Sequence, residues 1–202
     1  SIRHINIADW LDLALVAPAT ANIIGKMANG ISDDAVSSTL MAVNNLRVIV
    51  PAMNTKMFDN PATQANISRL ESFGYVVMEP VEGFLAEGYS GKGRMPSVED
   101  IVEMVEYQYM RHNSPQWLEG QKVVVTAGGT VERIDPVRYI SNDSSGQMGY
   151  AMARAASFYG ADVTLISTRR DLKVPHNIAA VYVDSAVEMQ QELNKYFLDT
   201  NY

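Results

Sequence analysis

Two short segments place small and polar residues directly after apolar, strand-like runs. Ala17–Asn22 reads A-P-A-T-A-N, and Pro51–Asn54 reads P-A-M-N. In an open parallel sheet, ligands bind at the carboxyl ends of the strands. Small side chains there let a flat ligand approach the backbone, and Thr20, Asn22 and Asn54 add polar contacts. Each segment also has a structural explanation, because Thr20 can cap a helix and asparagine often occupies a turn.

A third segment, Gly83–Pro96, holds four glycines within eleven residues. That density is typical of a mobile lid over a bound ligand. Lys92 and Arg94 within it can hold an anionic group of a substrate. The alternative explanation is an ordinary surface loop.

A fourth set of residues lies in the second half of the chain. Gly128-Gly129-Thr130 follows an apolar run, and Ser141–Gly146 leads into a predicted helix. Backbone N–H groups and serine hydroxyls at a helix N-terminus can cradle a phosphate. The pattern is neither the dinucleotide fingerprint G-x-G-x-x-G nor a Walker loop, and S-S-G before a helix is weak evidence alone.

Composition excludes several classes of function. The 202 residues include 16 basic and 23 acidic side chains, a net charge of −7 with no basic cluster, which argues against non-specific nucleic-acid binding. The absence of cysteine excludes disulfides, thiolate metal sites and a cysteine nucleophile within this chain. No apolar run approaches the roughly 18 residues of a membrane span. None of the three histidines has a metal-ligand partner at helical spacing, so we expect no resident metal site.

The elements that must position these residues alternate between strands and helices, which predicts parallel sheets with crossover helices. We expect one α/β domain over residues 1–112, a linker over 113–120 and a second α/β domain over 121–202. Both domains are expected to be incomplete, because no strand and phosphate loop open the chain and the second half has about three strands. The expected helices are Thr20 to Asn29, Asp34 to Val43, Asn60 to Gly74, one with Ile101, Val102, Val105 and Tyr109 on one side, Gly149 to Tyr159, and Ser185 to Phe197.

Taken in order, these segments resemble one family. His4-Ile5, fourteen residues before Pro18, the A-P-A-T-A-N and P-A-M-N-x-x-M segments, G-K-G-R-M-P and D-P-V-R-Y-I-S-N-D-S-S-G-Q-M-G are similar to the bifunctional flavoprotein of coenzyme A synthesis. In that family a phosphopantothenoylcysteine decarboxylase is fused to a phosphopantothenate–cysteine ligase. The resemblance covers nearly the whole chain.

For the first half, the resemblance implies a flavodoxin-like (HFCD-type flavoprotein) domain that holds FMN at a subunit interface of a homotrimer. His4 matches the catalytic histidine. The positions that match FMN contacts are Thr20, Ala21, Asn22, Ile23 and Ala52. The substrate-binding positions are Asn54, Met57, Ala86, Lys92 and Arg94.

The reaction implied is decarboxylation of 4′-phosphopantothenoylcysteine to 4′-phosphopantetheine. FMN first oxidises the cysteinyl end to a thioaldehyde, carbon dioxide leaves, and the flavin reduces the resulting enethiol. Glu87 departs from the family, since it stands where a cysteine proton donor is common. Glu87 can donate a proton if lid closure buries it and raises its pKa. Alternatively it marks a variant with a slow or different last step.

For the second half, the resemblance implies the start of a Rossmann-like, dimeric ligase domain that uses CTP and Mg²⁺ to join 4′-phosphopantothenate and cysteine. Asn142 matches a catalytic asparagine, and Gln147 stands where lysine is common. We expect the family's opening FMN loop before Ser1 and its lysine-rich nucleotide loop after Tyr202. The nucleotide-binding positions are Gly128, Gly129, Thr130, Ser145 and Gly146.

Two other functions remain open from the sequence. Relatives with this fold can act as non-catalytic, flavin-binding regulatory proteins, and the Glu87 change leaves room for that function. An NAD(P)-binding oxidoreductase in the second half is disfavoured by the missing third glycine and by Ser167-Thr168-Arg169, where an acidic residue is usual. The resemblance implies a cytoplasmic location, with neither a nucleic-acid nor a membrane partner.

Overall fold

The computed structural model describes residues 3–84 and 90–197. The chain divides into two compact units, Ser1–Tyr109 and Met110–Tyr202. Each unit is an α/β structure with its own core, so each is described by itself.

The first unit is built on a parallel sheet with the order β1-β2-β3. Leu13 pairs with Leu46 at the start of the sheet, and Ile49 pairs with Val77 farther along. The expected parallel α/β architecture is therefore confirmed for this unit. Its strands are β1 (Leu13–Ala19), β2 (Leu46–Pro51) and β3 (Val76–Val77).

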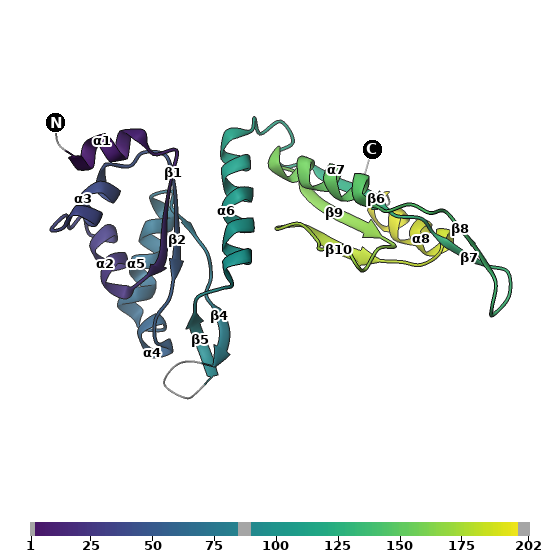
Figure 1. Ribbon diagram of the computed structural model, residues 1–202, viewed down its shortest axis with the longest axis horizontal. Coiled ribbons are helices and arrows are strands. Elements are labelled where there is room, and N and C mark those ends of the chain that lie inside the picture. Colours follow the sequence, from purple (N-terminus) through teal and green to yellow (C-terminus); the bar gives the residue numbers. More distant parts are fainter. Residues whose placement is uncertain (1–2, 85–89, 198–202) are drawn as a thin grey trace. The chain divides into compact units, whose positions relative to one another are not determined.

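Helices cover both faces of this sheet (Figure 1). On one face, Ile24 and Leu70 pack with Ile49. On the other face, Met104 packs with Val48, as expected from the alternation of side chains along a strand. The helices are α1 (Arg3–Trp10), α2 (Ala21–Ala28), α3 (Ala35–Ala42), α4 (Thr55–Phe58), α5 (Pro61–Ser72) and α6 (Val98–Asn113).

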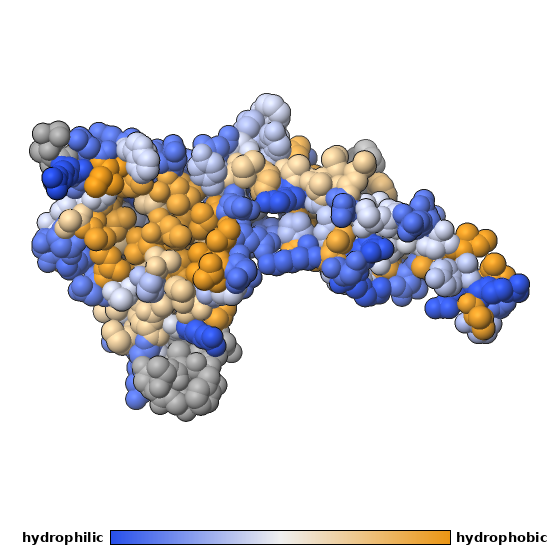
Figure 2. Space-filling view, viewed as in Figure 1, coloured by the Kyte–Doolittle hydropathy of each residue, from blue (hydrophilic) through white to orange (hydrophobic). Residues whose placement is uncertain are grey.

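Strand β1 is less buried than its apolar sequence predicts. It forms an edge of the sheet, and Leu15 is 42% exposed, whereas Ala14 and Ala19 are buried. Figure 2 shows apolar side chains gathered where Figure 1 draws β1 and β2. Leu15 pairs with the buried Val48 of β2 but has a neighbouring strand on one side only among the described residues.

The glycine-rich segment forms an antiparallel hairpin of β4 (Val81–Phe84) and β5 (Ser90–Arg94). Its tip, residues 85–89, lies outside the described residues. The hairpin leads into α6, whose start is capped by the Ser97 hydroxyl, which accepts from the Asp100 N–H at 3.1 Å.

The second unit has a three-stranded parallel sheet with the order β10-β9-β6. One helix packs on it through Tyr150 and Ala153, which contact Leu165 and Val163. An antiparallel hairpin is inserted between the first strand and that helix. The elements are β6 (Lys122–Ala127), β7 (Val131–Arg133), β8 (Tyr139–Ser141), α7 (Gln147–Phe158), β9 (Asp162–Ser167), β10 (Ala179–Tyr182) and α8 (Ala186–Phe197).

Three local expectations need correction. The helix expected from Asn60 to Gly74 ends at Ser72, and Phe73 is its exposed C-cap. Helix α6 buries Ile101, Met104 and Tyr107, which are three residues apart, so Val102 and Tyr109 face outward. The same helix runs to Asn113, into the segment read as a linker.

None of the helices within residues 3–84 and 90–197 has the length and apolarity needed to cross a bilayer.

Candidate functional site

The carboxyl edge of the first sheet joins three segments that are far apart in the sequence. The Ala52 N–H donates to the Ala19 carbonyl at 3.0 Å, which ties the P-A-M-N turn to the A-P-A-T-A-N turn. The Met53 N–H donates to the Gly93 carbonyl at 2.9 Å, which ties the same turn to the glycine-rich hairpin. The three segments therefore form one continuous backbone surface at this edge.

Gly93 makes the approach of the hairpin possible. Its φ of +137° is a conformation that side chains disfavour, and a Cβ placed on it would overlap the Met53 carbonyl oxygen. Strand β5 thus lies directly against the turn that precedes α4. The number of glycines in the segment does not reveal that position 93 needs a positive φ and must lack a side chain.

The turn after β1 opens helix α2. The Thr20 hydroxyl accepts from the Ile23 N–H at 3.4 Å, so the capping role expected for Thr20 is confirmed. Thr20 and Asn22 are exposed, and Ala21, Ile23 and Ala52 are half-buried. The edge therefore offers small side chains, two exposed polar side chains and the N-terminal end of a helix. That combination suits a planar ligand with an anionic substituent.

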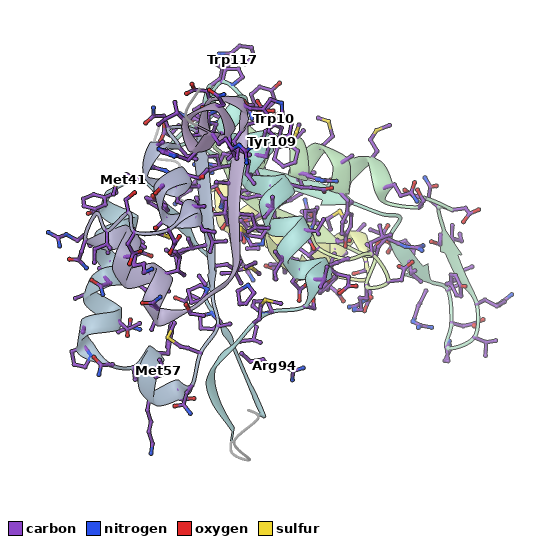
Figure 3. The ribbon with its side chains drawn as sticks, turned by 60° about the vertical axis from the view of Figure 1, so that its left-hand side comes forward. Trp10, Met41, Met57, Arg94, Tyr109 and Trp117 are labelled. Atoms are coloured by element: carbon purple, nitrogen blue, oxygen red, sulfur yellow. The ribbon has the colours of Figure 1, made fainter. Side chains whose placement is uncertain are left out.

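Asn54 also has a structural role. Its side-chain oxygen accepts from the Lys56 N–H at 2.8 Å and caps α4. Met57, on the same helix, is 51% exposed, and Arg94 of β5 is exposed as well. Figure 3 shows Met57 and Arg94 at the end of the sheet where α4 and β5 lie, with Trp10 at the other end.

Three expected site residues cannot be placed from the described structure, and a fourth, His4, lies elsewhere. Ala86 and Glu87 lie outside the described residues, and so does the side chain of Lys92, whose backbone belongs to β5. His4 lies on α1, which precedes the start of β1 and packs through Ala8 beside Leu40 and Val43. Helix α1 sits near the opposite edge of the sheet from the turn that carries Asn54 (Figure 1).

The carboxyl edge of the second sheet brings four of its expected residues together. A Cβ on Gly129 would overlap the Asn142 carbonyl oxygen, and a Cβ on Gly146 would lie 3.4 Å from the Gly128 nitrogen. Gly128 and Gly146 both have positive φ, +91° and +75°. The hairpin β7–β8 thus leaves and returns at one place, directly before α7.

The hydroxyls of the S-S-G segment are partly engaged in the turn. The Ser144 hydroxyl accepts from the Gly146 N–H at 3.3 Å, and the Ser145 hydroxyl accepts from the Gln147 N–H at 3.4 Å. Gly146 caps α7 without a side-chain hydrogen bond. The start of this twelve-residue helix therefore presents backbone donors next to the two glycine turns.

Sequence reasoning missed two residues at this edge. Thr168 follows β9, and its Oγ1 is buried with no hydrogen-bond partner among the described residues, while a Cβ on Gly128 would overlap that oxygen. Arg169 passes 2.8 Å from the position of a Gly146 Cβ and pairs with Asp171, which lowers the pKa of that carboxyl. Because parallel strands end at a common edge, the residues after β9 were the available signal.

A third glycine was also missed. A Cβ on Gly149 would lie 2.5 Å from the Ala127 Cβ, so Gly149 allows close packing of α7 on β6. This is the packing role of the third glycine in a dinucleotide fingerprint. Here the hairpin β7–β8 separates it from Gly128.

Across residues 3–84 and 90–197, no three acidic or histidine side chains are grouped as metal ligands.

Comparisons with known proteins agree with the division of the chain. A family model described as Flavoprotein matches residues 1–110, and one described as DNA/pantothenate metabolism flavoprotein C-terminal domain matches residues 118–202. The coenzyme A biosynthesis bifunctional protein CoaBC of Bacillus subtilis (strain 168) is 51% identical over 191 residues, which are 94% of this chain and 47% of the relative.

A more distant relative has the same description. CoaBC of Mycobacterium tuberculosis (strain ATCC 25618 / H37Rv) is 41% identical over 198 residues, 97% of this chain and 47% of the relative. The chain thus spans about half the length of the curated relatives it matches. Among solved structures, a mutant PPC decarboxylase complexed with pantothenoylaminoethenethiol matches with a TM-score of 0.53 and 31% identity. That match covers 54% of this chain and 61% of the other, and it supports a flavodoxin-like parallel-sheet fold.

Proposed function

The chain belongs to the flavoprotein family, and from this premise we propose that its first unit binds FMN and decarboxylates 4′-phosphopantothenoylcysteine to 4′-phosphopantetheine in coenzyme A biosynthesis. The observation that carries the proposal is the hydrogen-bonded continuity from Ala19 through Ala52 and Met53 to Gly93. It joins the flavin-binding and substrate-binding positions that the family resemblance implies.

The residues at this edge fit FMN. Ala19, Ala21 and Ala52 have no side chain beyond Cβ, so a flat ring system can approach the backbone there. Thr20 and Asn22 supply exposed polar groups, and Ile23 supplies apolar contact. When bound, FMN would supply the two-electron oxidation that labilises the carboxylate and, after carbon dioxide has left, the two-electron reduction of the enethiol.

The side chains next to the flavin positions are suited to a substrate that is anionic at both ends. We assign Asn54 to the substrate carboxylate, because it carries a side-chain amide on the turn that follows the flavin position Ala52. Met57 gives apolar contact, and Arg94, Lys92 and the Ala86 region of the hairpin hold the remaining substrate. Closing the hairpin over the substrate would exclude water from this edge.

His4 enters this site from a second protomer in our proposal. Within one chain it lies on the helix near the opposite edge, so a single chain does not complete the site. The first unit exposes apolar side chains that association would cover: Trp10 is 81% exposed, and Ile7 and Leu15 are partly exposed. These features support a homo-oligomer, trimer-based for the decarboxylase.

Glu87 is proposed as the proton donor to the reduced product. A carboxylic acid can replace the usual thiol as a general acid if the closed lid keeps it protonated. The alternative is that the final reduction is slow in this protein.

For the second unit we propose the nucleotide end of a Rossmann-like, dimeric ligase site that uses CTP with Mg²⁺ to join 4′-phosphopantothenate and cysteine. Gly128, Gly129, Thr130, Ser145 and Gly146 would hold the nucleotide phosphates at the start of α7, and Asn142 would contact the activated acyl group. The Thr168 hydroxyl, buried and unpartnered among the described residues, supports a ligand at this edge. In this proposal the complete ligation reaction is an activity of a full-length protein, since this chain spans about half the length of its relatives.

The test of the decarboxylase uses the purified protein. An absorbance scan should show flavin bands, and addition of 4′-phosphopantothenoylcysteine should release one equivalent of carbon dioxide per product thiol. Flavin binding without carbon dioxide release would instead identify a non-catalytic flavoprotein. A protein without flavin bands after incubation with FMN would contradict the proposal.

The metabolite substrates of the proposed reaction are consistent with a cytoplasmic location.

A further inference from the structure

The first unit contains a cavity of about 420 Å³ that the proposed function does not use. It lies on the face of the sheet that carries α2 and α5, and its volume is within the usual range for small-molecule sites, about 300–1,000 Å³. Its lining includes Asn29, Ile31, Met41, Arg47, Arg69 and Tyr75.

This cavity is at the edge where the strands begin. Arg47 is the second residue of β2, and Tyr75 directly precedes β3. Asn29 follows the end of α2, whose other end carries Thr20. The cavity therefore lies at the end of the sheet opposite the proposed flavin edge.

Arg47 is held rigidly in the cavity wall. Its Nη2 donates to the Phe73 carbonyl at 2.9 Å, and its guanidinium carbon lies 4.2 Å from the centre of the Tyr75 ring. Its Nε is buried and has no hydrogen-bond partner among the described residues. A partly buried cation without a counterion is costly, and an anionic group in the cavity would offset that cost.

A second cation lies at the same cavity. The Arg69 Nη1 donates to the Asn29 side-chain oxygen at 3.0 Å, and neither Arg69 nor Arg47 forms an ion pair with a described carboxylate. Among the described residues, none that lines the cavity is acidic. The neighbouring carboxylates Asp33 and Asp34 are engaged by Lys26 at 2.6 and 2.8 Å. The cavity thus carries two positive charges in a chain of net charge −7.

The remaining lining is apolar and accessible. Ile31, Met41 and Phe73 are each about half exposed, and Met41, labelled in Figure 3, projects from α3. Met27 lies deeper and packs against the core. An apolar body can therefore rest on these side chains while an anionic group faces the arginines.

We propose that this cavity is a binding site for a small molecule with one anionic group, such as a carboxylate, sulfonate or phosphate, on an apolar or aromatic body. The proposal does not depend on the decarboxylase assignment, since it rests on the cavity and its two arginines alone.

The test compares a charged and an uncharged fluorescent probe on the FMN-loaded protein. 8-Anilinonaphthalene-1-sulfonate should bind with one site per chain, and R69Q should weaken it at least fivefold. The Asn29 amide also donates to the Asn66 side-chain oxygen at 3.2 Å, so a link between α2 and α5 is kept in this variant. N-phenyl-1-naphthylamine, which lacks the sulfonate, should bind R69Q and the unmodified protein equally.

The matched control is E71Q. Glu71 lies on the same helix but lines a different cavity, of about 240 Å³, so E71Q should leave the affinity for the sulfonate probe unchanged. Equal sulfonate affinity in R69Q and the unmodified protein would overturn the proposal. So would an equal loss for both probes, or an affinity that falls as protein concentration rises, since a second copy would then occupy the cavity.

Discussion

The backbone N–H of Met53 donates to the carbonyl of Gly93 at 2.9 Å, although the two residues are far apart in the sequence. This bond fixes the base of the hairpin β4–β5 to the turn that carries Asn54. Because Gly93 has no side chain, the two backbones meet without an intervening atom. The position of the hairpin over the carboxyl edge therefore depends on one residue.

G93A should displace the hairpin from the turn. A backbone region open essentially to glycine costs another residue about 1–3 kcal/mol, and the added Cβ would overlap the Met53 carbonyl oxygen. We expect kcat/KM for decarboxylation to fall about tenfold or more, since about 1.4 kcal/mol corresponds to a factor of ten, while FMN remains bound. Steady-state carbon dioxide release and flavin absorbance measure the two effects.

G74A is the control for backbone strain alone. Gly74 also has a positive φ, +83°, but a Cβ there would have no described neighbour within 4 Å. G74A should lower stability and leave kcat/KM unchanged. If the two variants lose activity equally, the contact between Gly93 and Met53 is not what positions the hairpin.

N54D separates the structural role of Asn54 from its proposed substrate contact. Aspartate is as good a helix cap as asparagine, so the melting temperature should stay near that of the unmodified protein. The variant loses an amide donor and gains a charge that repels the substrate carboxylate. A charged hydrogen bond contributes about 1.5–3 kcal/mol, so KM should rise more than kcat falls. An unchanged KM would show that Asn54 is a cap only.

E87Q tests the proposed proton donor. Glutamine has the same shape and cannot donate an acidic proton, so carbon dioxide release should continue while formation of 4′-phosphopantetheine slows about 10²–10⁴-fold. E87D should restore part of the rate. Product formation by E87Q at the native rate would refute the assignment. It would favour the alternative, in which this protein has a slow or different last step.

D34N should show a stability loss that depends on pH. The Asp34 carboxylate accepts from Lys26 at 2.8 Å and from the Ser37 N–H at 2.8 Å, and the Lys26 bond is the main reason that the pKa of Asp34 lies well below its ordinary value. A lowered pKa in the folded state stabilises the protein above the unfolded pKa, about 4. That contribution is lost as pH falls through the folded value.

The melting temperature of the unmodified protein should therefore exceed that of D34N at pH 7, and the difference should shrink from about pH 5 downwards. Asparagine can still cap α3, so the difference reports the charge. D33N, which removes only the 2.6 Å pair with Lys26, is the companion variant. A difference that is equal at neutral and strongly acidic pH would contradict the ion-pair explanation.

Much of the fold could be predicted because local signals are strong. Thr20, Asp34 and Asn60 all cap the helices that their sequences predict. The hairpin β7–β8 was missed because its strands have only three residues each, too short for a visible alternation. The exposure of Leu15 was missed because an apolar run does not reveal whether a strand lies at a sheet edge.

The site could be predicted only in part, for a related reason. Each segment at the carboxyl edge could be found from its composition, but the bond from Met53 to Gly93 is a long-range contact that no local pattern contains. Thr168 and Gly149 were missed because the residues that they contact, Gly128 and Ala127, lie elsewhere in the sequence. The separation of His4 from Asn54 depends on how α1 packs beside α3, which spacing along the chain does not indicate.

Strand β2 has one practical consequence for inhibitor discovery. It carries Arg47 near its start and leads into Asn54 just beyond its end, with buried residues between them. A compound that binds beside Arg47 does not occupy the substrate positions, so any inhibition it causes would be noncompetitive. Screens run with substrate in large excess would suppress compounds that act at the far end of the strand and would retain those that act beside Arg47.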